Sequence, residues 1–473
     1  MGSLREECGV FGIWKQGRED VAHDIYYGLT ALQHRGQEAA GIAVCDMDGD
    51  AGNICLHKDM GLVSEVFSGE TLSKLVGNVG IGHVRYSTTG ESSANNAQPL
   101  SYHYLKGTLA LVHNGNIVNA EKLKEDLMRE GVVFRATSDT EVIAMMISKM
   151  RAHTGSIEEA VSQVTKHLIG GYALIVMSPR KLVAIRDPLG LKPLCVGKIE
   201  GGYVLASESC ALSAVGAKFL RDVKPGEIIT IRDGELFSDE TLCHEKLAHC
   251  VFEYIYFARL DSVLDNISVY SARFTAGELL ATENPVEADL VTGVPESGMT
   301  AAAGYAHESG IPFAHAFHKN SYVGRTFIKP TQKERLAGVH MKLNVIEEVV
   351  RGKSIVLIDD SIVRGTTIAN LIGMLRQAGA KAVHVRISSP PFLYPCYYGT
   401  DVPDNSQLIA KQFSTEEIRE KIGADSLAYL QLEDLLKMTK GLPICSACFD
   451  GNYPTKTVCM KSERSDSCSI EGD

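Results

Sequence analysis

The 473-residue sequence lacks any apolar run approaching the roughly 20 residues that a membrane-spanning helix requires. It also lacks the basic segment followed by an apolar stretch that marks a secretion signal. Positive charge is in deficit, with 47 Lys and Arg against 58 Asp and Glu and a formal net charge of −11. Because nucleic-acid binding requires a basic face, this charge argues against it. We therefore expect a cytoplasmic protein that engages neither a membrane nor nucleic acid.

The twelve cysteines are too few for a disulfide scaffold in a chain of this length. They therefore need another role, as packing residues, as a nucleophile or as metal ligands. The length itself predicts two or three domains rather than one.

Residues 354–367 carry the most informative pattern, SIVLIDDSIVRGTT. An apolar run typical of a buried parallel strand precedes Asp359 and Asp360, and a helical pattern opens at Ile368 after a small-residue loop. This order predicts a phosphate site at the carboxyl edge of an α/β sheet, where the backbone N–H groups of residues 365–367 take the phosphate. The two aspartates are placed for sugar hydroxyls or for Mg²⁺. The alternative is a strand that ends in solvated acids before a capped helix.

Further strand patterns flank this motif in the second half of the chain. Strands are expected at residues 288–294, 313–317, 353–358 and 382–387, with a small-residue helix at 299–307. Such alternation predicts a parallel sheet with crossover helices. The basic stretch from Lys319 through Arg325 and Arg335 to Lys342 is either a solvated loop or a cationic lid that closes over a polyphosphate.

Cys8 follows seven residues of polar character and opens an apolar strand pattern. An isolated cysteine at such a place is usually a small packing residue. If residues 1–7 are removed as a leader, however, Cys8 carries a thiol beside a free α-amine. An α-amine has a pKa of about 7.7–8.0 and can act as the base for its own side chain. We therefore expect a cleaved leader and a nucleophile at Cys8, as in N-terminal nucleophile hydrolases.

The rest of the first half alternates between strand and helix patterns. Strands are expected at residues 41–45, 81–86, 109–113, 172–177, 182–186, 203–207 and 227–232. Helices are expected at residues 21–33, 120–130, 140–151 and 157–167. Many strands with helices in separate groups predict an α+β sandwich of two sheets with helices outside them (αββα), rather than a βαβ sheet.

Three short stretches in this half carry binding or reactive groups. Arg85, at a strand end, offers a fork of donors suited to a substrate carboxylate. Asn114 and Gly115 offer an amide N–H and a backbone N–H for an oxyanion hole. Asp139 opens a helix, where it either caps the helix or binds an α-ammonium group. A turn or a cap accounts for each stretch singly, but together, downstream of Cys8, they predict one site.

In order along the chain, CGVFG, LQHRGQE, GHVRYST, HNGN and SDTE resemble the class II glutamine amidotransferase domain. The resemblance implies that Cys8 is the nucleophile and that Arg85 binds the glutamine carboxylate. It also implies that Asn114 and Gly115 are the oxyanion donors and that Asp139 binds the glutamine amine.

Residues 354–367 resemble the phosphoribosyl pyrophosphate (PRPP) motif of type I phosphoribosyltransferases. The resemblance implies Mg²⁺ ligands at Ser297, Asp359 and Asp360, with one ion per subunit. The PRPP ligands that it implies are the two aspartates, the lid residues Arg325 and Lys342, and the loop residues Ser361, Ile362, Val363, Arg364, Gly365, Thr366 and Thr367. Ser321 stands where the lid pattern usually has an arginine.

The two halves together are similar to the glutamine PRPP amidotransferases, also called amidophosphoribosyltransferases, which open de novo purine synthesis. The resemblance implies transfer of glutamine-derived ammonia to PRPP, feedback by purine nucleotides and a homotetramer. It divides the chain into a leader (1–7), a glutaminase domain (8–245), a phosphoribosyltransferase domain (246–455) and a polar tail (456–473). Two other interpretations are a different class II amidotransferase, such as a sugar-phosphate synthase, and a catalytically silent PRPP-sensing regulator.

Cysteine spacing alone does not choose between zinc and an iron–sulfur cluster. One branch of the family has a cleaved leader and holds one [4Fe–4S] cluster per subunit, and the matching positions here are Cys250, Cys396, Cys445 and Cys448. The alternative is four reduced core cysteines. The remaining cysteines are expected to be unligated in the tail, at Cys459 and Cys468, or to be packing residues, at Cys45, Cys55, Cys195, Cys210 and Cys243.

Overall fold

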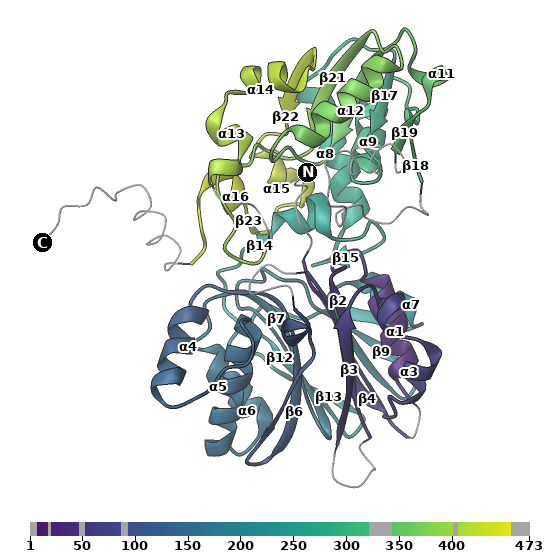
Figure 1. The fold of residues 1–473 in the computed structure, drawn as a ribbon. Helices are drawn as coiled ribbons and strands as arrows, with labels where there is room; N and C mark the ends of the chain where they lie inside the picture. The colour runs from purple at the N-terminus through teal and green to yellow at the C-terminus, as the bar shows by residue number, and fades with distance from the viewer. Residues whose placement is uncertain are drawn as a thin grey trace, which may run out of the picture.

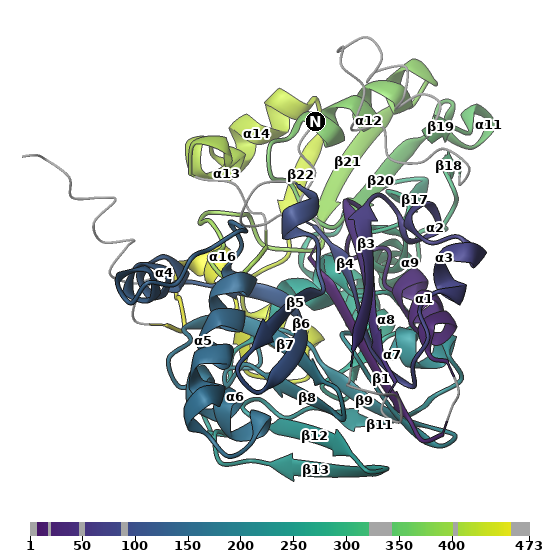
Figure 2. The same ribbon diagram turned by 60° about the horizontal axis from the view of Figure 1, so that its bottom comes forward.

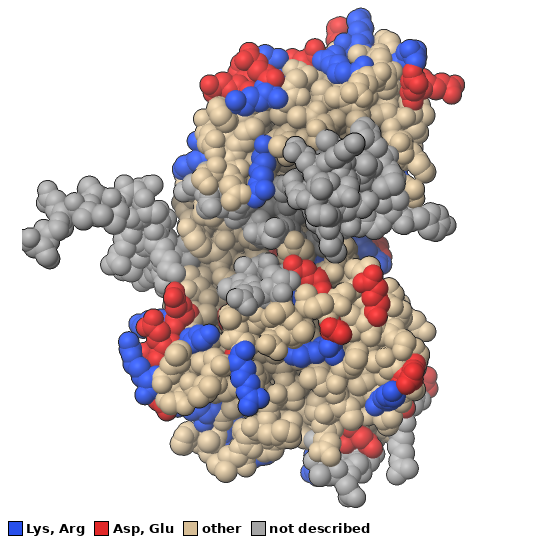
Figure 3. Space-filling view, in the orientation of Figure 1, with Lys and Arg blue, Asp and Glu red and all other residues tan. Residues whose placement is uncertain are grey.

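The computed structural model describes residues 7–17, 20–46, 53–86, 93–320, 343–400 and 405–455 (Figure 1). The first half of the chain forms two stacked β-sheets with helices outside them, and the second half forms a smaller sheet surrounded by helices (Figures 1 and 2). On the face drawn in Figure 3, basic and acidic side chains are interspersed. Within the described ranges, no helix has both the length and the apolar character needed to cross a membrane.

The first sheet has seven strands in the order β11-β9-β10-β1-β4-β2-β3. Their bounds are β1 (Gly9–Lys15), β2 (Ala39–Cys45), β3 (Ile54–Met60), β4 (Val79–Arg85), β9 (Cys195–Ile199), β10 (Gly202–Ala206) and β11 (Lys218–Asp222). β1 pairs antiparallel with both β4 and β10, so the strand that follows Cys8 is central in the sheet. Because Gly9 pairs with Val84, residue 8 lies beside the carboxyl end of β4.

The second sheet has six antiparallel strands in the order β13-β12-β8-β7-β6-β5. Their bounds are β5 (Leu100–Tyr104), β6 (Gly107–Ile117), β7 (Gly170–Ser178), β8 (Lys181–Arg186), β12 (Ile228–Arg232) and β13 (Glu235–Asp239). Val10 and Ile81 of the first sheet pack with Val112 and Ile175 of the second, and all four are fully buried. Each such side chain contributes about 1.5–3 kcal/mol of burial free energy, so the contact between the sheets is a substantial part of the core of this half.

Helices cover the outer face of each sheet. α1 (Ala22–Ala31), α2 (Val63–Val66), α3 (Gly69–Ser73) and α7 (Ser209–Ala214) lie on the seven-stranded sheet, and α4 (Ala120–Arg129), α5 (Asp139–His153) and α6 (Ile157–Thr165) lie on the six-stranded sheet. Ile25 and Leu29 of α1 are spaced four residues apart and are fully buried against the first sheet. The predicted sandwich of two sheets between two helical layers is confirmed.

The second half contains a parallel sheet in the order β17-β20-β21-β22. Its strands are β17 (Leu290–Gly293), β20 (Ser354–Asp359), β21 (Ala382–Ile387) and β22 (Ser426–Tyr429). Val356 and Ile358 pack against α8 (Val269–Glu283) and α9 (Met299–Ser309), while Ile355 and Leu357 pack against α12 (Thr366–Gln377) and α14 (Thr415–Ile422). Alternate residues of β20 are therefore buried on opposite faces, as expected of a parallel sheet covered on both sides.

The chain changes direction across the sheet between β17 and β20. After β17 the chain first passes one side of that strand, where Phe313 forms a parallel bridge to Val291. It then crosses to the other side of β17 and pairs there as β20. Ligands in such folds bind beyond the carboxyl ends of the strands at this kind of switch point. The predicted phosphate loop lies there.

The predicted strand at residues 313–317 is wrong. Phe313 forms a single bridge at the sheet edge and is 38% exposed, and β18 (Phe317–Lys319) begins only at the end of the predicted range. β18 pairs with β19 (Leu343–Val345) instead of joining the main sheet. The stretch lies at an edge after Pro312, so only one neighbouring strand can pair with it.

Candidate active sites

Cys8 directly precedes β1 and is 9% exposed. Its S–H donates to the carbonyl oxygen of Tyr86 at 3.4 Å. Burial raises the pKa of this thiol to about 11, against the lowering effects of the Tyr86 hydrogen bond and the Arg85 charge. With this raised pKa the thiol is neutral at pH 7. In a chain that retains Glu7 the nitrogen of residue 8 is an amide, so no α-amine lies beside the thiol.

The predicted oxyanion donors lie together on β6. Asn114 is 1% exposed, and its Nδ2 has no hydrogen-bond partner among the described residues. Gly115 has φ +140°, and a Cβ there would come within 2.0 Å of the Gly171 carbonyl oxygen, so only glycine fits. A buried, unpartnered amide is the kind of donor that can bind an oxygen whose negative charge forms only during reaction.

Asp139 is the first residue of α5 and is 7% exposed. Its Oδ2 accepts from the backbone N–H of Ile117 at 3.0 Å, and Nδ1 of His113 lies 3.6 Å from its Oδ1. Burial raises the pKa of Asp139, but His113 and the N–H groups of Ile117 and Thr140 more than offset this effect and hold that pKa below its usual value. The charge of Asp139, like that of Arg85, acts on the Cys8 thiol, so the structure brings these predicted residues to one site.

Glu7, which the polar sequence of residues 1–7 places in a leader, is buried and only 1% exposed. Its Oε1 lies 2.6 Å from Nζ of the buried Lys192 and accepts from Oγ1 of Thr400 at 2.7 Å. Burial raises the pKa of Glu7, but Lys192 and Arg35 more than offset this and hold it below its usual value. The junction between leader and nucleophile is thus anchored by an ion pair in the protein interior.

Arg35, from the predicted polar turn after α1, is also fully buried. Its Nε donates to the carbonyl oxygen of Cys8 at 3.1 Å, and its guanidinium pairs with Glu208 and Glu253, each at 2.6 Å. Glu208 further accepts from Oγ of Ser262 at 2.7 Å. Because Glu253 and Ser262 come from the second half of the chain, this network connects both halves to the backbone of the nucleophile.

The second predicted site is a cavity at the end of β20. It is lined by Tyr256, Val294, Ser297, Asp359, Asp360, Ser361, Ile362, Val363, Arg364, Gly365, Thr366, Thr367 and Ile368. The predicted loop residues and Ser297, which follows β17, therefore face one cavity. Gly365 precedes α12 with φ +78°, a left-handed conformation that glycine adopts without strain, and it turns the loop into the helix.

Asp359 and Asp360 are buried side by side, at 7% and 6% exposed. Oγ of Ser297 donates to Oδ1 of Asp359 at 3.3 Å, and the backbone N–H of Asp360 donates to the same atom at 2.9 Å. Burial, and then the neighbouring Asp360, raises the pKa of Asp359 well above its usual value. A buried carboxylate pair with a hydroxyl, all oxygen donors, fits Mg²⁺, whose charge would relieve this repulsion.

Tyr256 lies on a short π-helix (Glu253–Phe257) between the two sites. Glu253, at its start, pairs with Arg35, whereas Tyr256 lines the cavity at the end of β20. Burial raises the pKa of Tyr256, and Asp360 and Asp359 add to the rise. One short helix therefore contacts the surroundings of both predicted sites.

Another cavity is lined by the four predicted cluster ligands together with Lys192. Cys250, in β14 (His249–Cys250), is placed opposite Cys445 by parallel pairing with β23 (Ile444–Cys445). Cys448 lies in α16 (Ala447–Asp450), and Cys396 lies in the loop after β21. None of the described cysteines forms a disulfide.

The same cavity is otherwise lined by apolar and aromatic side chains, such as Leu191 and Phe252. Burial raises the pKa of Cys445 to about 12 and holds that of Cys448 well above its usual value. Four partly buried thiols around one cavity match the donor set of a four-thiolate cluster.

Of the cysteines expected to be packing residues, Cys45, Cys195 and Cys210 are buried and Cys243 is partly buried. Cys55 is exposed, so that expectation is wrong for it. The reason is its place on β3, an edge strand most of whose side chains reach solvent.

Several predicted residues lie outside the described part of the chain. These are the lid residues Ser321, Arg325, Arg335 and Lys342, the leader residues 1–6, and Cys459 and Cys468 of the tail. Lys319, at the start of the predicted lid, is described, and its Nζ lies 3.1 Å from Glu296.

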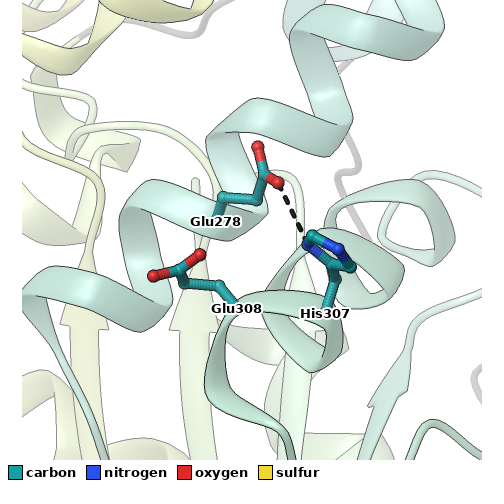
Figure 4. Close-up of side chains that lie close together, drawn as sticks. All are labelled: Glu278, His307 and Glu308. Atoms are coloured by element: carbon teal, nitrogen blue, oxygen red, sulfur yellow. Dashed lines mark ion pairs between the residues drawn. The ribbon is translucent and has the colours of Figure 1, made fainter.

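A separate group of side chains lies between α8 and α9 (Figure 4). Nδ1 of His307 is 3.2 Å from the carboxylate of Glu278, and Glu308 lies beside them. The His307 side chain is 67% exposed and Glu308 is also exposed, so this group is a solvated surface ion pair, apart from the cavities above.

Comparison with known proteins gives matches over nearly the whole chain. A family profile described as a glutamine amidotransferase domain matches residues 83–214. The chain is 47% identical over 464 residues to the amidophosphoribosyltransferase of Methanocaldococcus jannaschii, covering 95% of this chain and 98% of that relative. It is 47% identical over 460 residues to the amidophosphoribosyltransferase of Bacillus subtilis, covering 96% of this chain and 95% of the relative.

Among solved structures, the glutamine PRPP amidotransferase of Bacillus subtilis complexed with ADP and GMP superposes with a TM-score of 0.87 at 47% identity. The alignment covers 95% of this chain and 98% of that chain. Identity and coverage of this extent establish that the chain belongs to the amidophosphoribosyltransferase family.

Proposed function

We propose that this chain catalyses the first step of de novo purine synthesis: glutamine, PRPP and water give 5-phosphoribosylamine, glutamate and pyrophosphate. The observation that carries the proposal is the cavity at the end of β20, which residues 359–367 line together with Ser297. A sugar-phosphate synthase with a class II glutaminase domain has no use for such a phosphate loop.

In the first reaction, the Cys8 sulfur attacks the side-chain amide carbon of glutamine. Arg85 and Asp139 bind the carboxylate and ammonium groups of the substrate, and Asn114 and Gly115 donate hydrogen bonds to the tetrahedral oxyanion. The C–N bond breaks, ammonia leaves, and water hydrolyses the glutamyl thioester to glutamate. The α-amine of a chain that begins at Cys8 accepts the thiol proton and returns it to the leaving nitrogen.

In the second reaction, ammonia attacks C1 of PRPP and the bond to pyrophosphate breaks. The backbone N–H groups at the start of α12 bind the 5′-phosphate, and the aspartates hold the ribose hydroxyls while positive charge develops on the ring. Ser297, Asp359 and Asp360 would hold Mg²⁺, which supplies charge neutralisation of the leaving pyrophosphate. Arg325 and Lys342 are proposed to close over the phosphates.

Ammonia becomes largely ammonium if it crosses bulk water at neutral pH, so it requires a dry passage between the sites. We place this passage near Tyr256, which is partly buried and lines the cavity at the end of β20. The Glu253–Arg35 pair at the other end of the same π-helix supports this location.

Cys250, Cys396, Cys445 and Cys448 would hold a [4Fe–4S] cluster, which supplies a structural link between residues far apart in the sequence. Lys192 lines the same cavity, so its ammonium can offset part of the negative charge of four thiolates. The four cysteines are partly buried, and the cavity that they share is otherwise lined largely by apolar and aromatic side chains, which supports a cluster with limited access to water.

Release of glutamate that depends on PRPP tests the whole proposal. A different amidotransferase would release glutamate independently of PRPP, whereas a silent regulator would bind PRPP without releasing any. We further propose cytoplasmic activity, a homotetramer and inhibition by purine nucleotides. Light scattering tests the subunit number, and titration of adenine and guanine nucleotides into the same assay tests the inhibition.

A further inference from the structure

The side chain of Gln98 replaces a missing backbone pairing next to the predicted oxyanion donors. β5 and β6 pair at Leu100 and Leu111, and the same register places Gln98 opposite His113. Pro99 has no N–H, so the ladder does not continue through it. Instead, Oε1 of Gln98 accepts from the His113 N–H at 2.7 Å, and its Nε2 donates to the His113 carbonyl at 3.3 Å. The side-chain amide thus acts as a substitute peptide group.

The same amide also reaches the start of α5. Nε2 of Gln98 lies 3.1 Å from Oγ1 of Thr140, which directly follows Asp139. Asn96, two residues earlier, makes a similar pair of contacts: its Oδ1 accepts from the Thr137 N–H at 3.0 Å, and its Nδ2 donates to Oγ1 of Thr137 at 2.8 Å. Two side-chain amides from residues 96–98 therefore hold the turn that positions Asp139.

The strand β4 also contacts the backbone of His113. Nε2 of His83 donates to the His113 carbonyl at 3.0 Å, and His83 lies two residues before Arg85 on β4. The backbone N–H and C=O of His113, together with Gln98, therefore connect the strand of Arg85, the strand of Asn114 and the helix of Asp139. Displacing reacting groups by about 1 Å can lower a rate by roughly 100-fold, so the connection between these elements bears on catalysis.

We propose that Gln98 is a positioning residue for the glutamine site, holding the oxyanion donors in register with the ligands of the substrate carboxylate and ammonium. It is 5% exposed and acts through His113 and Thr140. The proposal rests on the glutaminase reaction proposed above. It deepens that proposal by assigning the alignment of the site to a residue outside the five predicted glutamine-site residues.

The test compares Gln98→Leu with Asn78→Leu. Asn78 is also a buried amide, 2% exposed, and its Nδ2 donates to the Gly17 carbonyl at 2.6 Å near the opposite end of β4 from Arg85. In Gln98→Leu, kcat/KM for glutamine should fall by about 10- to 100-fold, with both kcat and KM changed, because oxyanion donors and substrate ligands shift together. Ammonia-dependent synthesis should stay within about twofold of the parent in both variants, since neither substitution touches the cavity at the end of β20.

A second readout separates positioning from a general loss of structure. Labelling of Cys8 by the glutamine-shaped electrophile diazo-oxo-norleucine should slow in Gln98→Leu, whereas labelling by iodoacetamide, which needs no substrate pocket, should not. Should Gln98→Leu be insoluble, Gln98→Met carries the same test with a flexible chain of similar length.

Parental glutamine kinetics in a folded Gln98 variant would overturn the proposal. So would equal losses of glutamine- and ammonia-dependent activity in the Gln98 and Asn78 variants, since that pattern indicates a stability effect. Failure of the proposed reaction itself is distinct, because the unsubstituted protein would then show no PRPP-dependent glutamate release.

Discussion

Removal of residues 1–7 should change how Cys8 responds to pH. With the bond to Glu7 intact, burial keeps the pKa of the thiol at about 11, and the Glu7 carboxylate adds to the rise. Cleavage would take that carboxylate away and leave an α-amine with a pKa of about 7.7–8.0 beside the thiol. The amine can then accept the thiol proton, so the cleaved chain should form its reactive nucleophile near pH 8.

The size of the effect follows from the two pKa values. A thiol with a raised pKa stays neutral below that pKa, so at pH 8 only about one Cys8 in a thousand is a thiolate in the leader-bearing chain. Its alkylation rate should climb by about tenfold per pH unit between pH 7 and pH 10. In the cleaved chain the rate should level off near pH 8. At that pH the cleaved chain should react faster than the leader-bearing chain, and the ratio of the two rates measures how much the α-amine assists the thiol.

The assay is alkylation by iodoacetamide, followed by peptide mass spectrometry across this pH range. It compares a protein encoded from Met1 with one encoded as methionine followed directly by Cys8, and intact mass establishes where each purified chain begins. The exposed Cys55 provides an internal reference in both proteins, since it is not part of the Cys8 environment. A leader-bearing chain whose Cys8 reactivity levels off near pH 8, or that has full glutaminase activity, refutes the reasoning.

Four sets of substitutions test the rest of the mechanism. Cys8→Ala should abolish glutamine-dependent synthesis but leave synthesis from saturating ammonia at alkaline pH, and loss of both would contradict two separate sites. Changing Asp359 and Asp360 together to Asn should lower synthesis from either nitrogen source by about a thousandfold, because ligands for ribose and Mg²⁺ are lost at once; a near-normal rate would exclude their role. Gly115→Ala should lower glutaminase kcat by about 10²–10³-fold through its clash with a backbone carbonyl, with ammonia-dependent synthesis as the control. Serine at any of the four cavity cysteines should give unstable protein without iron and sulfide by elemental analysis, while Cys55→Ser should retain both; zinc in anaerobically purified protein would overturn the cluster.

Buried strands are predictable from this sequence because a short, continuous apolar run between turn residues is typical of them. β20 is such a stretch, whereas in β21 apolar residues alternate with His384 and Arg386, and the structure places both strands close to the expected limits. Edge strands are not predictable in the same way. β3 carries Lys58 and Asp59 among its seven residues and packs few side chains, so neither a run nor a clear alternation marks it.

The long helix α8 is not among the helices expected from the sequence, for a different reason. Its buried residues, such as Ala272, Ala276 and Leu280, follow helical spacing, but Tyr270 and Phe274 add apolar surface elsewhere on the helix. Tyr270 is 51% exposed, and its ring stacks on Phe274 at 5.9 Å. Apolar residues around much of the circumference hide the period that sequence analysis depends on.

Contacts in the candidate sites are likewise predictable where the residues are close in the sequence and not where they are far apart. Residues 359–367 lie in one short motif, so their shared cavity follows from the sequence order. Arg35 and Glu253 lie 218 positions apart, and no local pattern indicates that they pair. Glu7 and Lys192 are also paired only by the fold, and a polar leader sequence gives no sign that its last residue is buried.

The Arg35 network limits how far the two halves can be treated as interchangeable modules. Glu208, in the first half, accepts hydrogen bonds from Oγ of Ser262 and from the backbone N–H of Arg259, and Arg35 depends on Glu253. A glutaminase half fused to an unrelated partner would leave these groups buried and incompletely paired, at a cost of about 3–5 kcal/mol for each broken buried pair. A chimaera of this enzyme should therefore keep residues 253–262 together with the glutaminase half, and the junction with the other protein should lie after residue 262.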